Sequence, residues 1–526
     1  MSLIEVLARA EAVAAGRAQP AATVRHRHLS ERPLILVPLT TAGEAGAPLG
    51  ALVGTERDSP TLLTVPQPRD RDLRFAFLAE LARVVLPHLE SAQDAVEREE
   101  RGGEEIELCT DAPQLILPNG PGVEFVRLLG RSTRFRRTAE QDPETPFPAP
   151  AQVPLLGRWL THYGERARVP GSCLLVAMTE LLARHWTTGQ SAVEDRHLGA
   201  LLAWIEAAQH RGSDGAREAL RAETDRDADG LLRTPPAGPA TDPAFDNTLL
   251  APAVERYDAG VPGAEREIAG LIRSQLLPTW QAVWRGLDLL RGLPEAAGVP
   301  DRWRRDRFSY THHRDRVRAG EPPQPRRDDA VTAANKLASR EQAQARLDAQ
   351  EALDDPLVMA ARRLAGEAFA SVVVEVRPAY TEGPRPRPRP LVTVRTEDDP
   401  HLAEGGTVHR ATPGGGPKQT AELADVPSDG LFTLRLTGGM GRGKEPAPGS
   451  VPQVGEQVLW TLFEHAPRGG PALPEPEDTP WTHGGPPDGT VLPAPHPPSR
   501  EASGGSGSTT RVTADPPDPE TPEDFL

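Results

Sequence analysis

The chain has 526 residues, which is more than one hydrophobic core usually supports, so two to four domains are expected. Gly and Pro contribute 48 and 57 residues, a content that predicts long linkers or tails beside the compact parts. With a net charge of -16 the molecule as a whole repels polyanions. Charge acts locally, however, and it is unevenly spread along this chain.

The two cysteines, Cys109 and Cys173, stand in no ligand-like spacing, which argues against a disulfide framework and against a zinc site. The N-terminus has no basic segment followed by an apolar core, and the longest apolar runs are too short to span a bilayer. We therefore expect a cytoplasmic protein that makes no membrane contact.

Residues 1–141 predict an α/β layer domain. Apolar residues recur at helical spacing in two segments, and short β-type runs bounded by Gly, Pro or Ser lie between and after them. The helices are predicted over residues 2–15 and 71–89, and the strands over residues 33–39, 49–54, 61–65 and 114–117. Their order along the chain is α-β-β-β-α-β.

A Pro-rich linker near residues 142–154 leads into a helical domain with loop insertions, predicted over residues 154–371. A polar stretch at residues 211–243 interrupts it, and Pro278 is expected to kink one of its helices. Helical periodicity is found over residues 155–163, 173–186, 192–207, 268–290 and 330–369.

From residue 372 the period changes to that of strands, which predicts a small β-barrel over residues 372–466. Its strands are predicted at residues 372–376, 390–396, 406–409, 431–436 and 457–463. Residues 467–526 are acidic, rich in Pro and Gly and almost without apolar residues, so a disordered tail is expected. The predicted fold class is thus a multi-domain protein that joins an α/β domain, an all-α domain and a small β-barrel.

Two motifs imitate binding loops without completing them. Residues 438–444 (GGMGRGK) match the start of a phosphate-binding P-loop, but Glu445 stands where Ser or Thr is needed and Pro446 prevents a regular helix. Residues 225–230 (DRDADG) match the start of an EF-hand, but Pro236 occupies the position of the bidentate carboxylate. We interpret them as a barrel turn and a solvated acidic loop, so no cofactor is expected.

Three histidines of the helical region, His162, His185 and His197, are candidates for a metal site with nearby carboxylates. They lack the close i, i+3 or i+4 pairs that typify such sites on helices. Histidines flanked by aromatic residues on helices are more often packing residues. The main prediction is therefore that the protein has no metal site, and the three histidines remain an alternative.

Arginines interleaved with aromatic residues occur in two segments. This combination suits phosphate contact together with base stacking. The alternatives are an interdomain surface where arginines bind carboxylates of this acidic protein, or simply a solvated face. The candidate contact residues for nucleic acid or a protein partner are Arg131, Arg134, Arg136, Arg137, Arg302, Trp303, Arg304, Arg305, Arg307 and Tyr310.

The α-β-β-β-α-β order of residues 1–117 resembles the core of the restriction-endonuclease-like PD-(D/E)xK nucleases. That resemblance implies a carboxylate at the start of the second core strand and an acid-x-lysine triplet on the third, which together bind magnesium. Residues 61–67 read TLLTVPQ and supply neither acid nor lysine, so the resemblance implies a degenerate, catalytically silent version.

The barrel region resembles the small β-barrels placed ahead of helicase cores, with Gly406-Thr407 and Pro448-Gly449 as turn landmarks. Over most of residues 30–465 the chain is similar to uncharacterised actinobacterial proteins, a resemblance that implies no particular activity, cofactor or site. A GC-rich source fits the scarcity of lysine, which occurs only as Lys336, Lys418 and Lys444.

Groups that activate water, hold a metal or bind a nucleotide do not occur together in a workable order, so we expect no enzyme. The predicted function is a non-catalytic accessory or scaffold protein of a nucleic-acid-processing system, of the helicase, nuclease or defence kind. Its expected partner is an ATPase or nuclease, with nucleic acid as a further candidate. The alternatives are a metal-dependent hydrolase or nuclease with a dispersed active site, and a protein-binding scaffold without nucleic-acid contact.

Overall fold

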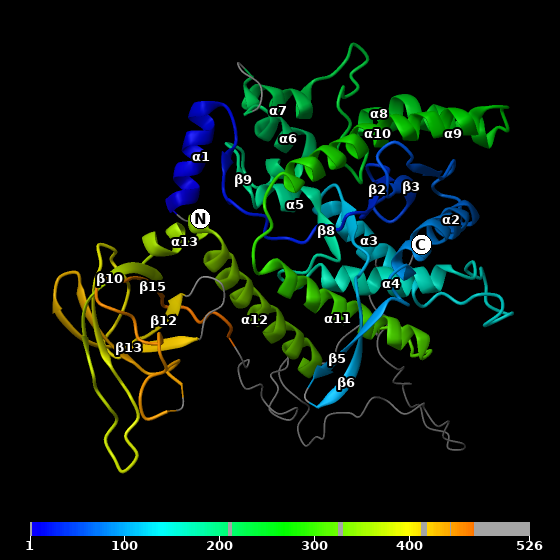
Figure 1. Ribbon diagram of the computed structural model, residues 1–526. Coiled ribbons are helices and arrows are strands. Elements are labelled where there is room, and N and C mark those ends of the chain that lie inside the picture. The colour runs from blue at the N-terminus through cyan, green and yellow to red at the C-terminus, as the bar shows by residue number, and fades with distance from the viewer. Residues whose placement is uncertain are drawn as a thin grey trace, which may run out of the picture.

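The computed structural model describes residues 3–101, 103–208, 213–324, 330–411, 418–441 and 443–467. The tail predicted over residues 467–526 lies outside them, except for its first residue. Among the described residues, no helix is both long and apolar enough to cross a membrane. Helices and several sheets alternate along the chain, and the strands between residues 368 and 461 form a closed barrel (Figure 1).

A five-stranded sheet lies in the first part of the chain, with the spatial order β4-β3-β2-β7-β8. Strands β2, β7 and β8 are parallel, whereas β3 is antiparallel to both β2 and β4. Every residue of β2 is buried, as expected for a strand covered on both faces. The strands are β2 (Leu34–Thr40), β3 (Pro48–Gly54), β4 (Thr61–Thr64), β7 (Leu115–Leu117) and β8 (Leu175–Ala177).

Two smaller pairs of strands flank this sheet. Strand β1 (Gln19–Pro20) pairs with β9 (Trp186–Thr187), and β5 (Val96–Arg101) pairs with β6 (Glu104–Cys109) in a hairpin. The β5–β6 hairpin was not predicted, because its residues are mostly charged and give no apolar alternation.

Most of the remaining described chain is helical. The helices are α1 (Leu3–Ala15), α2 (Arg71–Glu90), α3 (Gly120–Thr133), α4 (Val153–Arg166), α5 (Met178–Ala183), α6 (Leu198–Glu206), α7 (Gly215–Thr224), α8 (Pro243–Phe245), α9 (Ala251–Asp258), α10 (Ala264–Arg291), α11 (Val299–Arg318), α12 (Ala330–Asp354) and α13 (Pro356–Leu364). Two irregular turns, η1 (Glu194–Arg196) and η2 (Asp246–Leu250), complete them.

The predicted order α-β-β-β-α-β is confirmed as α1, β2, β3, β4, α2 and β7, with β1 and the β5–β6 hairpin as additions. The helix predicted over residues 173–186 is wrong in its first half, because Leu175–Ala177 forms β8 and pairs with β7. A short buried apolar run reads the same in a strand and in a helix, and only its pairing decides between them.

One hydrophobic core runs from Ala12 to Tyr310 and joins the sheet to the helices around it. Strand β8 lies beyond the linker predicted at residues 142–154, yet it completes the same sheet. Helices α3 and α4 pack so closely at Gly130 that a Cβ atom there would stand 2.6 Å from the amide nitrogen of Thr161. Only glycine, which has no side chain, fits at this position. Thus the helices after the linker pack on the sheet that precedes it.

The C-terminal part is a closed barrel of six strands in the order β10-β11-β14-β13-β12-β15. The predicted small barrel is confirmed, with one more strand than expected because half of β13 is polar and exposed. Phe369, Val394 and Trp460 are among the residues that fill its interior. The strands are β10 (Ala368–Arg377), β11 (Leu391–Arg395), β12 (Thr407–Ala411), β13 (Gln419–Ser428), β14 (Leu431–Leu436) and β15 (Gln457–Thr461).

The barrel is joined to the helical part through α12 and α13. Ala352, Met359 and Ala368 form a small apolar cluster between them. Beside this cluster Arg363 binds Asp398 through two hydrogen bonds of 2.8 and 3.0 Å. These contacts leave the opposite end of the barrel, where β10 turns into β11, open to solvent (Figure 1).

Candidate nucleic-acid interface

The arginines of α11, predicted as contact residues, are largely engaged by carboxylates and carbonyls of the chain itself. Arg304 donates from Nε to Glu99 at 3.2 Å and makes a second hydrogen bond to the same carboxylate. Arg307 pairs with Glu97 and donates to the carbonyl of Cys109 at 2.7 Å. The β5–β6 hairpin therefore neutralises this face of the helix.

A second face of α11 is held by α12. Arg302 is 3% exposed and donates to the carbonyl of His26 and to Oε1 of Gln350, both at 3.1 Å. Arg305 donates to the same oxygen of Gln350 at 3.3 Å. A guanidinium as buried as that of Arg302 cannot reach an external phosphate.

The two aromatic candidates on α11 are also internal. The ring of Trp303 stacks on His28 with the centroids 4.0 Å apart, and its Nε1 donates to Asp111 at 2.9 Å. Tyr310 is fully buried and donates to the carbonyl of Leu89 at 2.7 Å. The α11 set thus has the geometry of the alternative interpretation, in which the arginines dock carboxylates.

All four candidates around the end of α3 have partners within the chain: Arg131, Arg134, Arg136 and Arg137. Arg134 is 4% exposed and donates to the carbonyls of Arg131 and Gln324 at 2.7 and 3.0 Å. Arg137 pairs with Asp142 at 2.9 Å, and Arg136 lies over the ring of Phe75.

The three histidines of the alternative metal site do not come together. The ring of His162 stacks on His313, His185 lies beside His26, and His197 caps α6 by accepting a hydrogen bond from its first turn. Burial lowers the pKa of His162 and brings that of His185 to about 4, so both are neutral packing residues. Within the described part of the chain, no three His, Cys, Asp or Glu side chains are placed to hold a metal ion.

The two imitation motifs are loops. Oδ1 of Asp227 accepts hydrogen bonds from the amides of Asp229 and Leu231, which shapes a turn inside residues 225–230. The glycine-rich residues 438–444 follow β14, and their described part contains no helix. Residues 445–447, which directly follow the second loop, line a pocket at the open end of the barrel.

At that end of the barrel, residues 378–390 form the connection between β10 and β11, named here the Pro-Arg loop. Its second half reads PRPRPRP, with an arginine before each of Pro386, Pro388 and Pro390. Proline fixes its own φ and confines the residue before it to extended conformations. Hydrogen bonds between Thr381 and Arg387 hold the two sides of the loop together.

The arginines of the Pro-Arg loop differ from those of α11 in having no acidic partner. Arg385 and Arg387 are exposed and Arg389 is half-buried. No carboxylate of the described chain forms an ion pair with any of the three. The loop thus presents three positive charges on a stiff, extended backbone in a protein of net charge -16.

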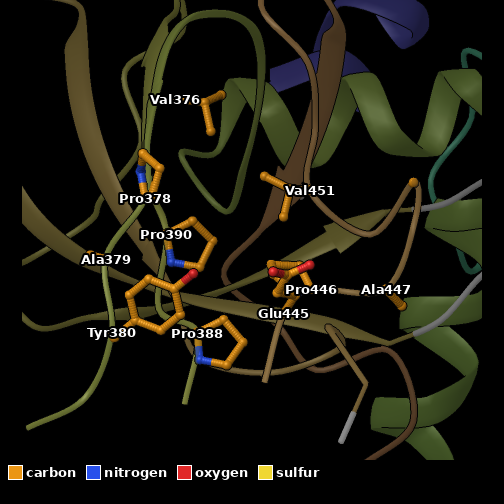
Figure 2. Close-up of a pocket in the computed structure, with 11 residues that line it drawn as sticks. Val376, Pro378, Ala379, Tyr380, Pro388, Pro390, Glu445, Pro446, Ala447 and Val451 are labelled. Carbon is orange, nitrogen blue, oxygen red and sulfur yellow. The ribbon is translucent and has the colours of Figure 1, made fainter. Parts of the chain in front are cut away.

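A pocket of about 370 Å³ lies at the base of the loop. Figure 2 shows Tyr380, Pro388 and Pro390 on one side of it, facing Pro446 and Val451 of the β14–β15 connection. The side chain of Tyr380 is 51% exposed, which is unusual for a large aromatic residue. The size and the apolar walls of the pocket suit a planar ring such as a nucleobase.

Polar groups surround this pocket. Glu445 lines it, and the exposed Lys444 precedes Glu445 in the chain. Arg435 is exposed on β14 opposite Leu391, at the strand end next to the loop. The Pro-Arg loop, the pocket and these side chains together form the barrel-end surface.

The sequence did not reveal the barrel-end surface, because residues 383–389 were interpreted only as turn residues between two predicted strands. The signal was present as three arginines that alternate with four prolines. The sequence could not show that Tyr380 and the prolines of this loop share a pocket with Glu445, which lies more than fifty positions further on.

Comparisons with known proteins leave the function open. The chain matches no protein-family model, and searches of the curated proteins and of the solved structures return no match.

Proposed function

We propose that the protein binds single-stranded nucleic acid through the barrel-end surface and acts as a non-catalytic accessory protein. The observation that carries this proposal is a contrast in partners: Arg304 and Arg307 of α11 form ion pairs, whereas Arg385, Arg387 and Arg389 form none within the described residues. Unpaired arginines attract phosphates, and an exposed aromatic ring beside them offers a stacking platform for a base. As part of the same proposal, the helical part contacts a protein partner such as an ATPase or nuclease.

The preference for a single strand rests on the pocket. A base must leave its duplex before it can lie against Tyr380 between the proline walls. The carboxylate of Glu445 can accept a hydrogen bond from an exocyclic amine, as acidic side chains do from cytosine. The strand would then pass over the Pro-Arg loop with its phosphates against the arginines.

The test is fluorescence anisotropy with short labelled single-stranded DNA and RNA over a range of salt concentrations. A triple variant, R385A/R387A/R389A, removes three phosphate contacts. For single strands the logarithmic salt slope is about 0.7 per contact, so its magnitude is expected to fall by about 2.

A matched control removes the same charge elsewhere. Arg17, Arg266 and Arg273 are exposed and form no ion pair in the described chain. The variant R17A/R266A/R273A is expected to keep the wild-type salt slope. Equal losses in both triple variants would reduce the effect to net charge, and wild-type protein that binds no oligonucleotide would refute the proposal.

A second candidate is a scaffold that docks an acidic protein segment on the same surface. The proline and tyrosine walls of the pocket favour it, because such walls also accept apolar side chains. The anisotropy measurement distinguishes the two functions, because a scaffold of this kind binds a labelled acidic peptide but no oligonucleotide.

A further inference from the structure

A large cleft, distinct from the pocket at the barrel end, lies at the carboxyl ends of the parallel strands. Its volume is about 1890 Å³. Strand β2 ends there at Thr40, β7 is followed by α3, and β8 is followed by α5. From this edge β2 continues to β3 on one side of the sheet, whereas β7 leads to β8 on the other.

In open α/β sheets this edge, where neighbouring strands connect in opposite directions, is the usual place for a ligand. Part of the crevice between β2 and β7 is closed by the segment that contains Pro239. The amide of Thr40 donates to the carbonyl of Pro239 at 2.7 Å, and Asn119 donates to the carbonyl of Gly238 at 2.8 Å. The open volume therefore lies beside this segment, toward α1, α5 and α12.

Positive charge in the cleft is only partly compensated. Arg27 and Arg184 share Glu351 at 2.9 and 2.6 Å. In contrast, Arg168 and Arg196 are exposed to the cleft and form no ion pair within the described residues.

Buried polar atoms without a partner also line the cleft. The hydroxyl of Thr179 belongs to a residue that is 3% exposed, and it makes no hydrogen bond. Nδ1 of His26, a residue that is 1% exposed, also lacks a partner, although its Nε2 contacts Asp355 at 3.3 Å. Buried polar groups normally have partners, so such atoms at a cavity wall are places where a ligand or a water molecule can bind.

Acidic groups stand close to the same edge. Glu180 lines the cleft, with Oε1 3.3 Å from where a Cβ atom of Gly120 would be, beside the first turn of α3. Burial raises the pKa of Glu180 and of Asp195, which also lines the cleft. Carboxyl groups at this edge of α/β sheets bind sugar hydroxyls, whereas helix N-termini and arginines bind phosphate.

We propose that this cleft binds a nucleoside phosphate. The phosphates lie against Arg168 and Arg196 near the start of α3, the hydroxyl of Thr179 donates to them, and Glu180 accepts from the sugar. The volume exceeds that of usual small-ligand pockets, so a ligand as large as a dinucleotide fits. This site is separate from the barrel-end surface and gives the protein a second, small-molecule input.

The proposal is tested by isothermal titration calorimetry of the full chain with ATP, NAD and inorganic pyrophosphate, without added metal. The key variant is Thr179→Val, which keeps the shape of the side chain and removes a hydroxyl that has no internal partner. The melting temperature of this variant is expected to be no lower than that of the wild type, and its affinity for the nucleotide about tenfold lower. Arg196→Ala is expected to lower the nucleotide affinity by a similar factor.

Two controls accompany these variants. Arg266→Ala removes an exposed, unpaired arginine on α10 and is expected to bind like the wild type. R385A/R387A/R389A is also expected to bind the nucleotide normally, so failure of the barrel-end proposal and failure of this one are distinguishable.

Three results would overturn the inference. One is the absence of saturable heat with ATP and NAD up to about 1 mM, which corresponds to a binding free energy weaker than about 4 kcal/mol. Another is unchanged nucleotide affinity in both Thr179→Val and Arg196→Ala. If pyrophosphate binds as tightly as either nucleotide, the assignment of a nucleoside is wrong.

Discussion

Helix α11 and the Pro-Arg loop both concentrate arginines, but the fold treats them in opposite ways. Along α11, Arg304 and Arg307 meet Glu99 and Glu97 of the β5–β6 hairpin. Along the loop, no carboxylate of the described chain approaches Arg385 or Arg387. The density of arginine in a sequence therefore does not reveal which arginines are free to meet a partner.

The physical basis of the difference is backbone freedom. An α-helix packs its side chains against neighbouring elements, so its arginines find carboxylates on them. In the Pro-Arg loop each proline fixes φ and keeps the preceding arginine extended, and the side chains of Arg385 and Arg387 stay exposed. We therefore expect mutations of the α11 arginines to lower the stability of the protein, and mutations of the loop arginines to lower its affinity for a ligand.

The strongest test of this comparison is Arg302→Ala on α11. Its guanidinium is buried and holds His26 and Gln350, so its loss is expected to lower the free energy of unfolding by about 3–5 kcal/mol. Arg305→Ala serves as control, because Arg305 donates to the same Gln350 oxygen from an exposed position, and it is expected to cost less than about 1 kcal/mol. Urea denaturation measures both, and equal stabilities would contradict the structural role of α11.

A second test titrates the packed region with acid. Burial holds the pKa of His185 at about 4, below the ordinary 6.5, so the unfolded state binds more protons between these values. Its contribution to stability is complete above pH 6.5 and is lost as the pH falls toward 4. Between about pH 7 and pH 5 this histidine is expected to remove about 2 kcal/mol from the free energy of unfolding.

The variant His185→Gln checks the assignment of that pH dependence. Urea denaturation at both pH values is expected to give a smaller loss on acidification than in the wild type. An identical loss in the two proteins would show that other groups carry it.

The third test addresses the barrel end. Tyr380→Ala removes the exposed ring beside the pocket and is expected to weaken binding of a single-stranded oligonucleotide about tenfold, or about 1.4 kcal/mol. Tyr380→Phe keeps the ring and is expected to bind like the wild type in the same anisotropy measurement. If both variants bind equally, base stacking on Tyr380 is excluded.

The smallest effect concerns the ion pair between Arg304 and Glu99. Because Arg304 is largely exposed, a double-mutant cycle with Arg304→Ala and Glu99→Ala is expected to give a coupling energy of about 0.2–1 kcal/mol. A coupling near zero would mean that this ion pair adds nothing to the contacts that Arg307 makes with Glu97 and with the carbonyl of Cys109.

Local sequence determined the elements of this protein. The strands at residues 33–39, 49–54 and 61–65, the helix at 71–89 and the barrel were predicted because periodicity and turn residues act over a few positions. Where that local signal was weak, as in the charged β5–β6 hairpin and in β8, prediction failed.

Tertiary structure alone decided which side chains are available to function. Arg304 and Glu99 are separated by 205 positions, and their pairing could not be read from either segment. The same holds for the separation of His162 from His185, and for the cleft formed where β2, β7 and β8 end together. Charge compensation and cavities depend on distances between remote segments, and these distances exist only once the chain has packed.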